Sequence, residues 1–234
     1  MKKHSKRYNE LLKLYDKSKE YTIKDAIEIV KKLATAKFNE TIDASIILGI
    51  NPKKAEENVR GTVVLPAGTG REVRVLVFAQ GDKEKEAQAG GADYVGLNDY
   101  IEKIQQGWFE FDAIVATPDV MKVVSKLGKI LGPKGLMPNP KLGTVTFEVA
   151  EAIKKLKSGQ IEFKVDKYGV IKTYFGKASF SKEDLEKNLI ALLKAVINAK
   201  PTTIASKFQY IKEVSISSTM SPGIKLQMSE VWSL

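Results

Sequence analysis

The sequence contains no cysteine and a single histidine, His4. Without cysteine, disulfides, thiolate nucleophiles and thiolate metal sites are excluded together, which fits a reducing cytoplasm. One histidine cannot build a two-histidine metal site, and a histidine-based triad would have to use this residue of the basic amino-terminal segment. We therefore expect no metal and no other cofactor, although a site built from Asp or Glu remains possible.

Long hydrophobic runs are missing as well. No apolar run approaches the roughly 20 residues that a membrane helix needs, and the charged amino terminus lacks the hydrophobic region of a signal peptide. We therefore expect a cytoplasmic protein with no membrane partner. Lysine plus arginine number 38 against 28 aspartate plus glutamate, a formal net charge of +10, which favours a polyanionic partner such as nucleic acid. A basic soluble enzyme is the competing reading of this charge.

The first and final thirds of the chain show the apolar alternation of half-buried strands, together with amphipathic helices. Thr22 and Asp25 form a variant capping box at the start of one of these helices. The elements that we expect in these thirds are helices at 5–20, 22–33 and 182–199 and strands at 41–50, 59–65, 161–165, 170–174, 210–217 and 224–228.

The middle third has a different pattern. Its strands at 73–79 and 113–117 are nearly continuous apolar runs, which are typical of strands covered on both faces. Helices expected at 81–89, 99–106 and 118–127, with a short strand at 92–96, complete a strand–helix rhythm that predicts a small parallel sheet. We therefore predict an α/β protein of two domains, in which both chain ends form one domain and the second is inserted. The expected crossing points are 68–70 and 158–159.

Two segments carry the residue types that RNA sites use. Residues 36–41 place Lys37, Phe38 and Thr41 together, a cation for phosphate, a ring for a base and a hydroxyl for a sugar. Residues 217–223 offer four hydroxyls and tight turns. Phe38 is equally plausible as core, and the second segment as a plain turn between strands. If the chain ends form one sheet, both segments could lie at one edge beside Lys164 and the basic amino-terminal helix.

The glycine- and proline-rich segment 131–143 is the main competitor as a functional site. Its glycines and two lysines could approach a phosphate, but no Gly-Lys-Ser/Thr follows, so it is not a Walker loop. It is equally a rigid connector. A nucleotide-dependent enzyme using the inserted domain is thus the alternative function, and saturable ATP or NAD binding would support it. A nonspecific basic scaffold, a third possibility, predicts equal affinity for any RNA of similar length.

The sequence resembles the ribosomal protein L-one family, the large-subunit protein of the mobile stalk, in its bacterial type. The resemblance runs nearly end to end and is strongest at residues 34–41, 58–63, 116–121, 130–140 and 218–220. It implies an α/β fold with a split α+β domain, an antiparallel sheet with helices, at 1–68 plus 159–234. It also implies a Rossmann-like three-layer α/β domain inserted at 69–158.

The resemblance further implies what the chain binds and does. Its partners would be large-subunit ribosomal RNA, tRNA at the exit site and its own operon messenger, whose translation it would repress. The protein would be a monomer off the ribosome, assist release of deacylated tRNA and not be an enzyme. The family usually has glycine where this chain has Ser221, which would cost about 1–2 kcal/mol if a positive φ is required there. The RNA-binding residues that we expect are Lys37, Phe38, Glu40, Thr41, Lys164, Ser218, Thr219, Met220, Ser221, Gly223, His4, Lys6 and Arg7.

Overall fold

The computed structural model describes residues 5–204 and 210–234 and shows a mixed α/β fold with antiparallel and parallel sheets. The chain divides into two compact units. Unit 1 comprises Met1–Gly70 and Ile161–Leu234, and unit 2 comprises Arg71–Gln160. No helix among the described residues is long and apolar enough to cross a membrane.

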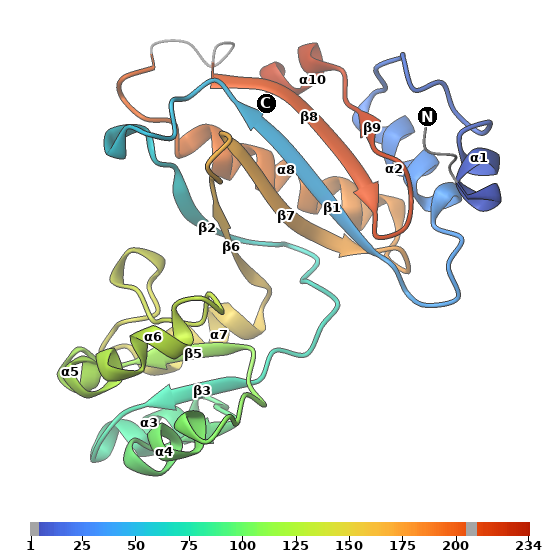
Figure 1. Ribbon diagram of the computed structural model, residues 1–234. Coiled ribbons are helices and arrows are strands. Elements are labelled where there is room, and N and C mark those ends of the chain that lie inside the picture. Colours follow the sequence, from blue (N-terminus) through green and yellow to red (C-terminus); the bar gives the residue numbers. More distant parts are fainter. Residues whose placement is uncertain (1–4, 205–209) are drawn as a thin grey trace. The chain divides into compact units, whose positions relative to one another are not determined.

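Unit 1 is built on an antiparallel sheet with the strand order β7-β1-β8-β9 (Figure 1). Its strands are β1 (Thr41–Leu48), β7 (Val170–Lys177), β8 (Ile211–Ser218) and β9 (Ile224–Lys225). The alternation predicted for the first strand is confirmed, because every second residue of β1 from Ile42 onward is buried. Because β1 lies between β7 and β8, strands from the amino-terminal and carboxy-terminal parts of the chain form one sheet. A separate pair, β2 (Arg60–Val64) and β6 (Gln160–Lys164), forms a two-stranded sheet.

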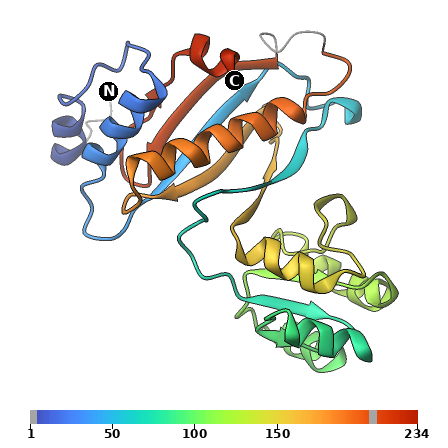
Figure 2. The ribbon, with the colours of Figure 1, turned by 180° about the vertical axis from the view of Figure 1, so that it is seen from behind.

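Helices α2 (Ile23–Leu33) and α8 (Lys182–Asn198) pack on one face of this sheet, which Figure 2 shows from the helix side. Thr22 caps α2 as the sequence predicts, since its hydroxyl accepts a hydrogen bond from the Asp25 N–H at 3.2 Å. Buried aliphatic side chains of α2, α8 and the sheet form one core cluster. Burial of these apolar surfaces is the main driving force that holds the two chain ends together.

Unit 2 contains a three-stranded parallel sheet with the order β4-β3-β5, as the rhythm of the middle third predicts. Two core clusters lie on the opposite faces of its fully buried strand β3. Its strands are β3 (Val75–Phe78), β4 (Tyr94–Val95) and β5 (Ala113–Ala116), and its α-helices are α3 (Asp82–Ala89), α4 (Asn98–Gln105), α5 (Met121–Val124), α6 (Gly128–Leu131) and α7 (Val149–Lys157).

Several sequence predictions of helices need correction. The helix predicted at 5–20 ends after six residues as α1 (Lys6–Leu11), and a turn at Asp16 and Ser18 follows. The helix predicted at 118–127 is a series of short 3₁₀ and α-helical turns. Helix α7 and the carboxy-terminal helix α10 (Met228–Ser233) were not predicted from the sequence periodicity. The 3₁₀ turns of the described residues are Ala55–Glu57, Pro118–Val120, Ser125–Leu127 and Pro140–Leu142.

Candidate RNA-binding site

Two loops of unit 1 lie side by side at the edge of the sheet where β1 begins (Figure 1). The α2–β1 loop comprises residues 34–40, and the β8–β9 loop comprises residues 219–223. They meet because β1 and β8 are antiparallel neighbours, with Ile42 opposite Ser218, so that one strand starts where the other ends. The sheet thus brings together segments separated by nearly the whole chain.

The carboxylate of Glu40 joins the two loops. Glu40 is 1% exposed, and its Oε2 accepts hydrogen bonds from the Ser218 hydroxyl at 2.7 Å and the Met220 N–H at 2.9 Å. Its Oε1 accepts a hydrogen bond from the Ala36 N–H at 2.9 Å. A buried carboxylate is tolerated only when hydrogen bonds replace its water, and these three bonds satisfy that requirement. Glu40 therefore fixes both loops in one geometry.

The pKa of Glu40 reflects this environment. Burial acts to raise its pKa, since burial disfavours the charged form. The hydrogen bonds from Ser218, Ala36 and Met220, with the positive charge of Arg7, outweigh burial and lower the pKa below its ordinary value of 4.5. Glu40 is therefore ionised at neutral pH and acts as a hydrogen-bond acceptor.

Thr219 and Thr41 make a second link between the loops. The Thr219 hydroxyl accepts a hydrogen bond from the Thr41 N–H at 3.0 Å, and the Thr219 N–H donates to the Thr41 carbonyl at 3.0 Å. The Lys177 ammonium donates to the Thr41 hydroxyl at 2.8 Å. In this structure the Thr219 hydroxyl thus positions the β8–β9 loop against β1.

The amino-terminal helix α1 is attached to the same loops. Arg7 donates from Nη2 to the Met220 carbonyl at 2.7 Å and from Nη1 to the Thr35 hydroxyl at 3.3 Å. Tyr15 donates from its hydroxyl to the carbonyl of Gly223 at 3.1 Å. These bonds hold the predicted residues Arg7, Met220 and Gly223 in one neighbourhood, next to the exposed Lys6.

Two large apolar side chains remain exposed on these hydrogen-bonded loops. Phe38 is 54% exposed and Met220 is 49% exposed, so the reading of Phe38 as a core residue is wrong. Lys37 is exposed next to Phe38. Exposed apolar side chains beside cations on ordered loops are characteristic of a binding surface, and this mixture suits RNA bases and phosphates.

The backbone of Ser221 is not in the positive-φ conformation that would favour glycine at this position. None of the non-glycine residues in the described part of the chain has a positive φ. The Ser221 hydroxyl instead accepts a hydrogen bond from the Ser218 N–H at 2.9 Å. The suspected conformational cost is therefore absent.

A Ser221→Gly variant tests this difference from the family. We expect it to lose about 0.5–1.5 kcal/mol of unfolding free energy, because the hydroxyl bond disappears and the loop gains freedom. Urea denaturation monitored by circular dichroism measures this change. An increase in stability on Ser221→Gly would show that the serine is strained after all.

Lys164 does not join the two loops. It ends β6, and the next residue, Val165, bridges to Ile171 near the start of β7. Thr41 pairs with Lys177 at the other end of β7. The possibility that Lys164 lies beside these loops is thus wrong, because the strand register places it near the opposite end of the sheet. The predicted residue His4 lies outside the described residues.

Sequence reasoning missed several residues that shape the site. Ala36 and Thr35 hold Glu40 and Arg7 through bonds that no local pattern reveals. Asn39 donates to the Ser179 hydroxyl at 2.9 Å and ties the α2–β1 loop to the end of β7. Only the pairing of β1 with β7 could have suggested this contact, because the two residues are 140 positions apart.

A mixed α/β fold with a basic, aromatic surface on ordered loops is typical of an RNA-binding protein. The model of the ribosomal protein L1p/L10e family matches residues 30–222 of the chain. The chain therefore belongs to this family. It is a ribosome-associated protein of the large subunit that binds RNA, and the family suggests a structural, non-enzymatic role.

Proposed function

We propose that this protein binds ribosomal RNA of the mobile stalk through the α2–β1 and β8–β9 loops of unit 1. The observation that supports this proposal is the buried Glu40 carboxylate, which locks two loops carrying exposed Phe38 and Met220 beside Arg7. A preorganised surface loses little conformational entropy on binding, so its contacts can favour one folded RNA over others. Phosphate contacts with lysine and arginine add affinity that depends on salt.

The proposal extends to domains and partners. In it, residues 1–68 plus 159–234 are the split RNA-binding domain and residues 69–158 are the inserted domain. The protein is a monomer off the ribosome, assists release of deacylated tRNA beside the exit site and represses translation of its own operon messenger. Repression follows if the messenger presents an RNA shape like that of the ribosomal site, because one protein surface then binds either RNA but not both.

Fluorescence anisotropy with a labelled stalk RNA and a scrambled RNA of equal length tests this binding. We expect a preference of roughly 1,000-fold for the stalk RNA, within the usual range for specific over nonspecific nucleic-acid binding. Phe38→Ala should weaken stalk RNA binding roughly 5- to 150-fold, because a base loses its stacking partner. Equal, steeply salt-dependent binding of both RNAs would reduce the site to a basic surface.

Thr219 needs a paired test because its hydroxyl bonds to the Thr41 backbone. Thr219→Ala should weaken stalk RNA binding roughly 5- to 150-fold, equivalent to about 1–3 kcal/mol, whereas Thr219→Ser should restore it because the hydroxyl remains. Unchanged affinity in the alanine variant would exclude Thr219 from the site. Competition by unlabelled operon leader RNA, weakened equally by Phe38→Ala, tests whether messenger and ribosomal RNA share one surface.

A further inference from the structure

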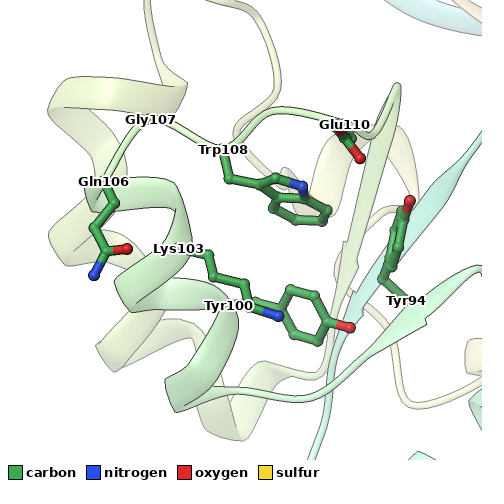
Figure 3. Close-up of a pocket in the computed structure, with 7 residues that line it drawn as sticks. All are labelled: Tyr94, Tyr100, Lys103, Gln106, Gly107, Trp108 and Glu110. Carbon is green, nitrogen blue, oxygen red and sulfur yellow. The ribbon is translucent and has the colours of Figure 1, made fainter.

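Unit 2 contains a cavity of about 500 Å³ that the RNA-binding site of unit 1 does not use. Three aromatic rings and three polar side chains surround it (Figure 3). The rings are Tyr94, Tyr100 and Trp108, and the polar side chains are Lys103, Gln106 and Glu110. We name this feature the aromatic pocket.

The rings of the aromatic pocket support one another. The Trp108 centroid lies 4.9 Å from that of Tyr94, with the rings nearly perpendicular at 87°, and 5.4 Å from that of Tyr100. Beneath them Phe111, which is 3% exposed, lies 5.3 Å from Trp108. Each of the three lining rings is therefore half-buried against the core and fixed, while part of it faces the cavity.

The end of helix α4 sets Trp108 beside Lys103. The Gly107 N–H donates to the Ile104 carbonyl at 3.0 Å, and the Trp108 N–H donates to the Lys103 carbonyl at 2.9 Å. These two bonds, together with the positive φ of 98° at Gly107, form a Schellman motif. In Schellman motifs, an apolar contact frequently joins the residue after the glycine to a residue of the last helical turn. In this chain these two residues are Trp108 and Lys103. Here the pair is an indole and an ammonium, and both side chains line the pocket (Figure 3).

This combination of groups matches an unpaired nucleotide. The half-buried rings offer a stacking surface for a base, and the Lys103 ammonium, which lies 4.8 Å from the Tyr100 ring centroid, supplies a positive charge for a phosphate. The Gln106 amide and Glu110 carboxylate provide hydrogen-bonding groups for the edge of a base. Proteins recognise single-stranded RNA with these three kinds of contact.

A basic segment continues from the aromatic pocket. Residues 120–147 contain five lysines and neither aspartate nor glutamate. One of these, Lys134, places its ammonium 4.0 Å from the ring centroid of Phe109, the residue after Trp108. An RNA strand with a base in the pocket would thus have cations along its backbone. This charge favours a nucleotide over a free cation as the occupant.

We propose that the aromatic pocket of unit 2 is a second RNA contact, which stacks one unpaired base on Tyr100 and Trp108 and pairs its phosphate with Lys103. This contact is separate from the loops around Glu40. It would let the chain hold a single-stranded or flipped-out nucleotide in addition to the folded element bound by unit 1.

Trp108 itself provides a local readout of this proposal. The chain has two tryptophans, so in a full-length Trp232→Phe variant Trp108 is the single source of indole fluorescence. We expect single-stranded hexa-adenylate RNA to quench this fluorescence saturably, and inorganic polyphosphate of similar charge to leave it unchanged. Tyr100→Ala in this background should weaken the RNA effect roughly 5- to 150-fold, the range for loss of a stacking ring.

Lys103→Ala and Lys85→Ala form a matched pair of charge variants. Both lysines are exposed on unit 2, but Lys85 belongs to α3 and does not line the pocket. Lys103→Ala should weaken the quenching by hexa-adenylate and lower its dependence on salt, whereas Lys85→Ala should change neither. Equal effects of the two substitutions would overturn the phosphate assignment.

Other results would overturn the nucleotide proposal as a whole. Quenching by tetramethylammonium but not by hexa-adenylate would make the aromatic pocket a cation cage, and equal quenching by polyphosphate would reduce it to a charge effect. Absence of saturable quenching by RNA would exclude a base from the pocket. Phe38→Ala should leave the Trp108 signal unchanged, so failure here is distinguishable from failure of the site in unit 1.

Discussion

Replacing Glu40 with alanine should lower the free energy of unfolding by about 3 kcal/mol and abolish the preference for stalk RNA. The substitution leaves three hydrogen-bond donors without their acceptor, those of Ala36, Ser218 and Met220. Each buried donor left unsatisfied costs about 1–3 kcal/mol, and partial relaxation toward water keeps the total near the lower end. The two loops then lose their fixed geometry, so the RNA surface is no longer preorganised.

Urea denaturation and RNA anisotropy measure these two effects separately. Glu213 provides a matched control, because it is a partly exposed carboxylate on β8 that pairs with Lys225 at 3.1 Å. Glu213→Ala should change the unfolding free energy by less than about 1 kcal/mol, as surface ion pairs usually do. Similar losses of stability in the two alanine variants would show that Glu40 is an ordinary carboxylate.

The pH dependence of stability gives an independent test of the same carboxylate. The folded state lowers the pKa of Glu40 below 4.5, so the ionised form stabilises the fold. This contribution is complete above pH 4.5 and is lost as the pH falls through the lowered folded value. The stability difference between the wild type and Glu40→Gln, which cannot titrate, should therefore be constant near neutral pH and shrink below pH 4.5. A difference that grows on acidification would mean that the protonated form is preferred in the fold.

Local sequence patterns predicted most of the elements of unit 1. The alternation along β1 and the cap at Thr22 are local features, so they could be read without coordinates. Helix α7 was also readable, since Val149, Ile153 and Leu156 follow helical spacing and are buried on one face. This helix is nevertheless missing from the elements predicted from the sequence. The amino-terminal helix was overestimated because a run of polar residues fits both a helix and the turn that forms after Leu11.

The contacts that hold the candidate site together were less predictable from the sequence than the residues that belong to it. Residue types alone indicated Lys37 and Phe38, because cations and rings next to each other are common in RNA sites. The role of Glu40 had no local signal, since its partner Ser218 lies 178 positions away and a glutamate between two loops usually faces water. Likewise, the separation of Lys164 from the loops follows from strand register, which short patterns do not determine.

Replacing Asn188 with alanine should destabilise the protein by about 3 kcal/mol without touching the RNA surface. Asn188 lies on α8 and is fully buried. Its Oδ1 accepts a hydrogen bond from the Ala67 N–H at 2.9 Å, and its Nδ2 donates to the carbonyls of Gly68 at 3.0 Å and Phe175 at 2.8 Å. Alanine leaves these three backbone groups without a partner, and each such group costs about 1–3 kcal/mol when water does not replace it.

Two further variants, Asn188→Asp and Lys187→Ala, test whether the loss of stability in Asn188→Ala comes from the lost hydrogen bonds. Aspartate keeps the acceptor but cannot donate to the two carbonyls, so its loss of unfolding free energy should be at least as large as that of alanine. Lys187, the exposed neighbour on α8, should tolerate alanine within about 0.5 kcal/mol. Hydrogen exchange at the Ala67 amide gives the local readout, because this amide should lose protection in Asn188→Ala more than amides of β1. Unchanged protection there would mean that Asn188 does not hold residues 67–68, the segment through which the chain approaches the end of unit 1 at Gly70.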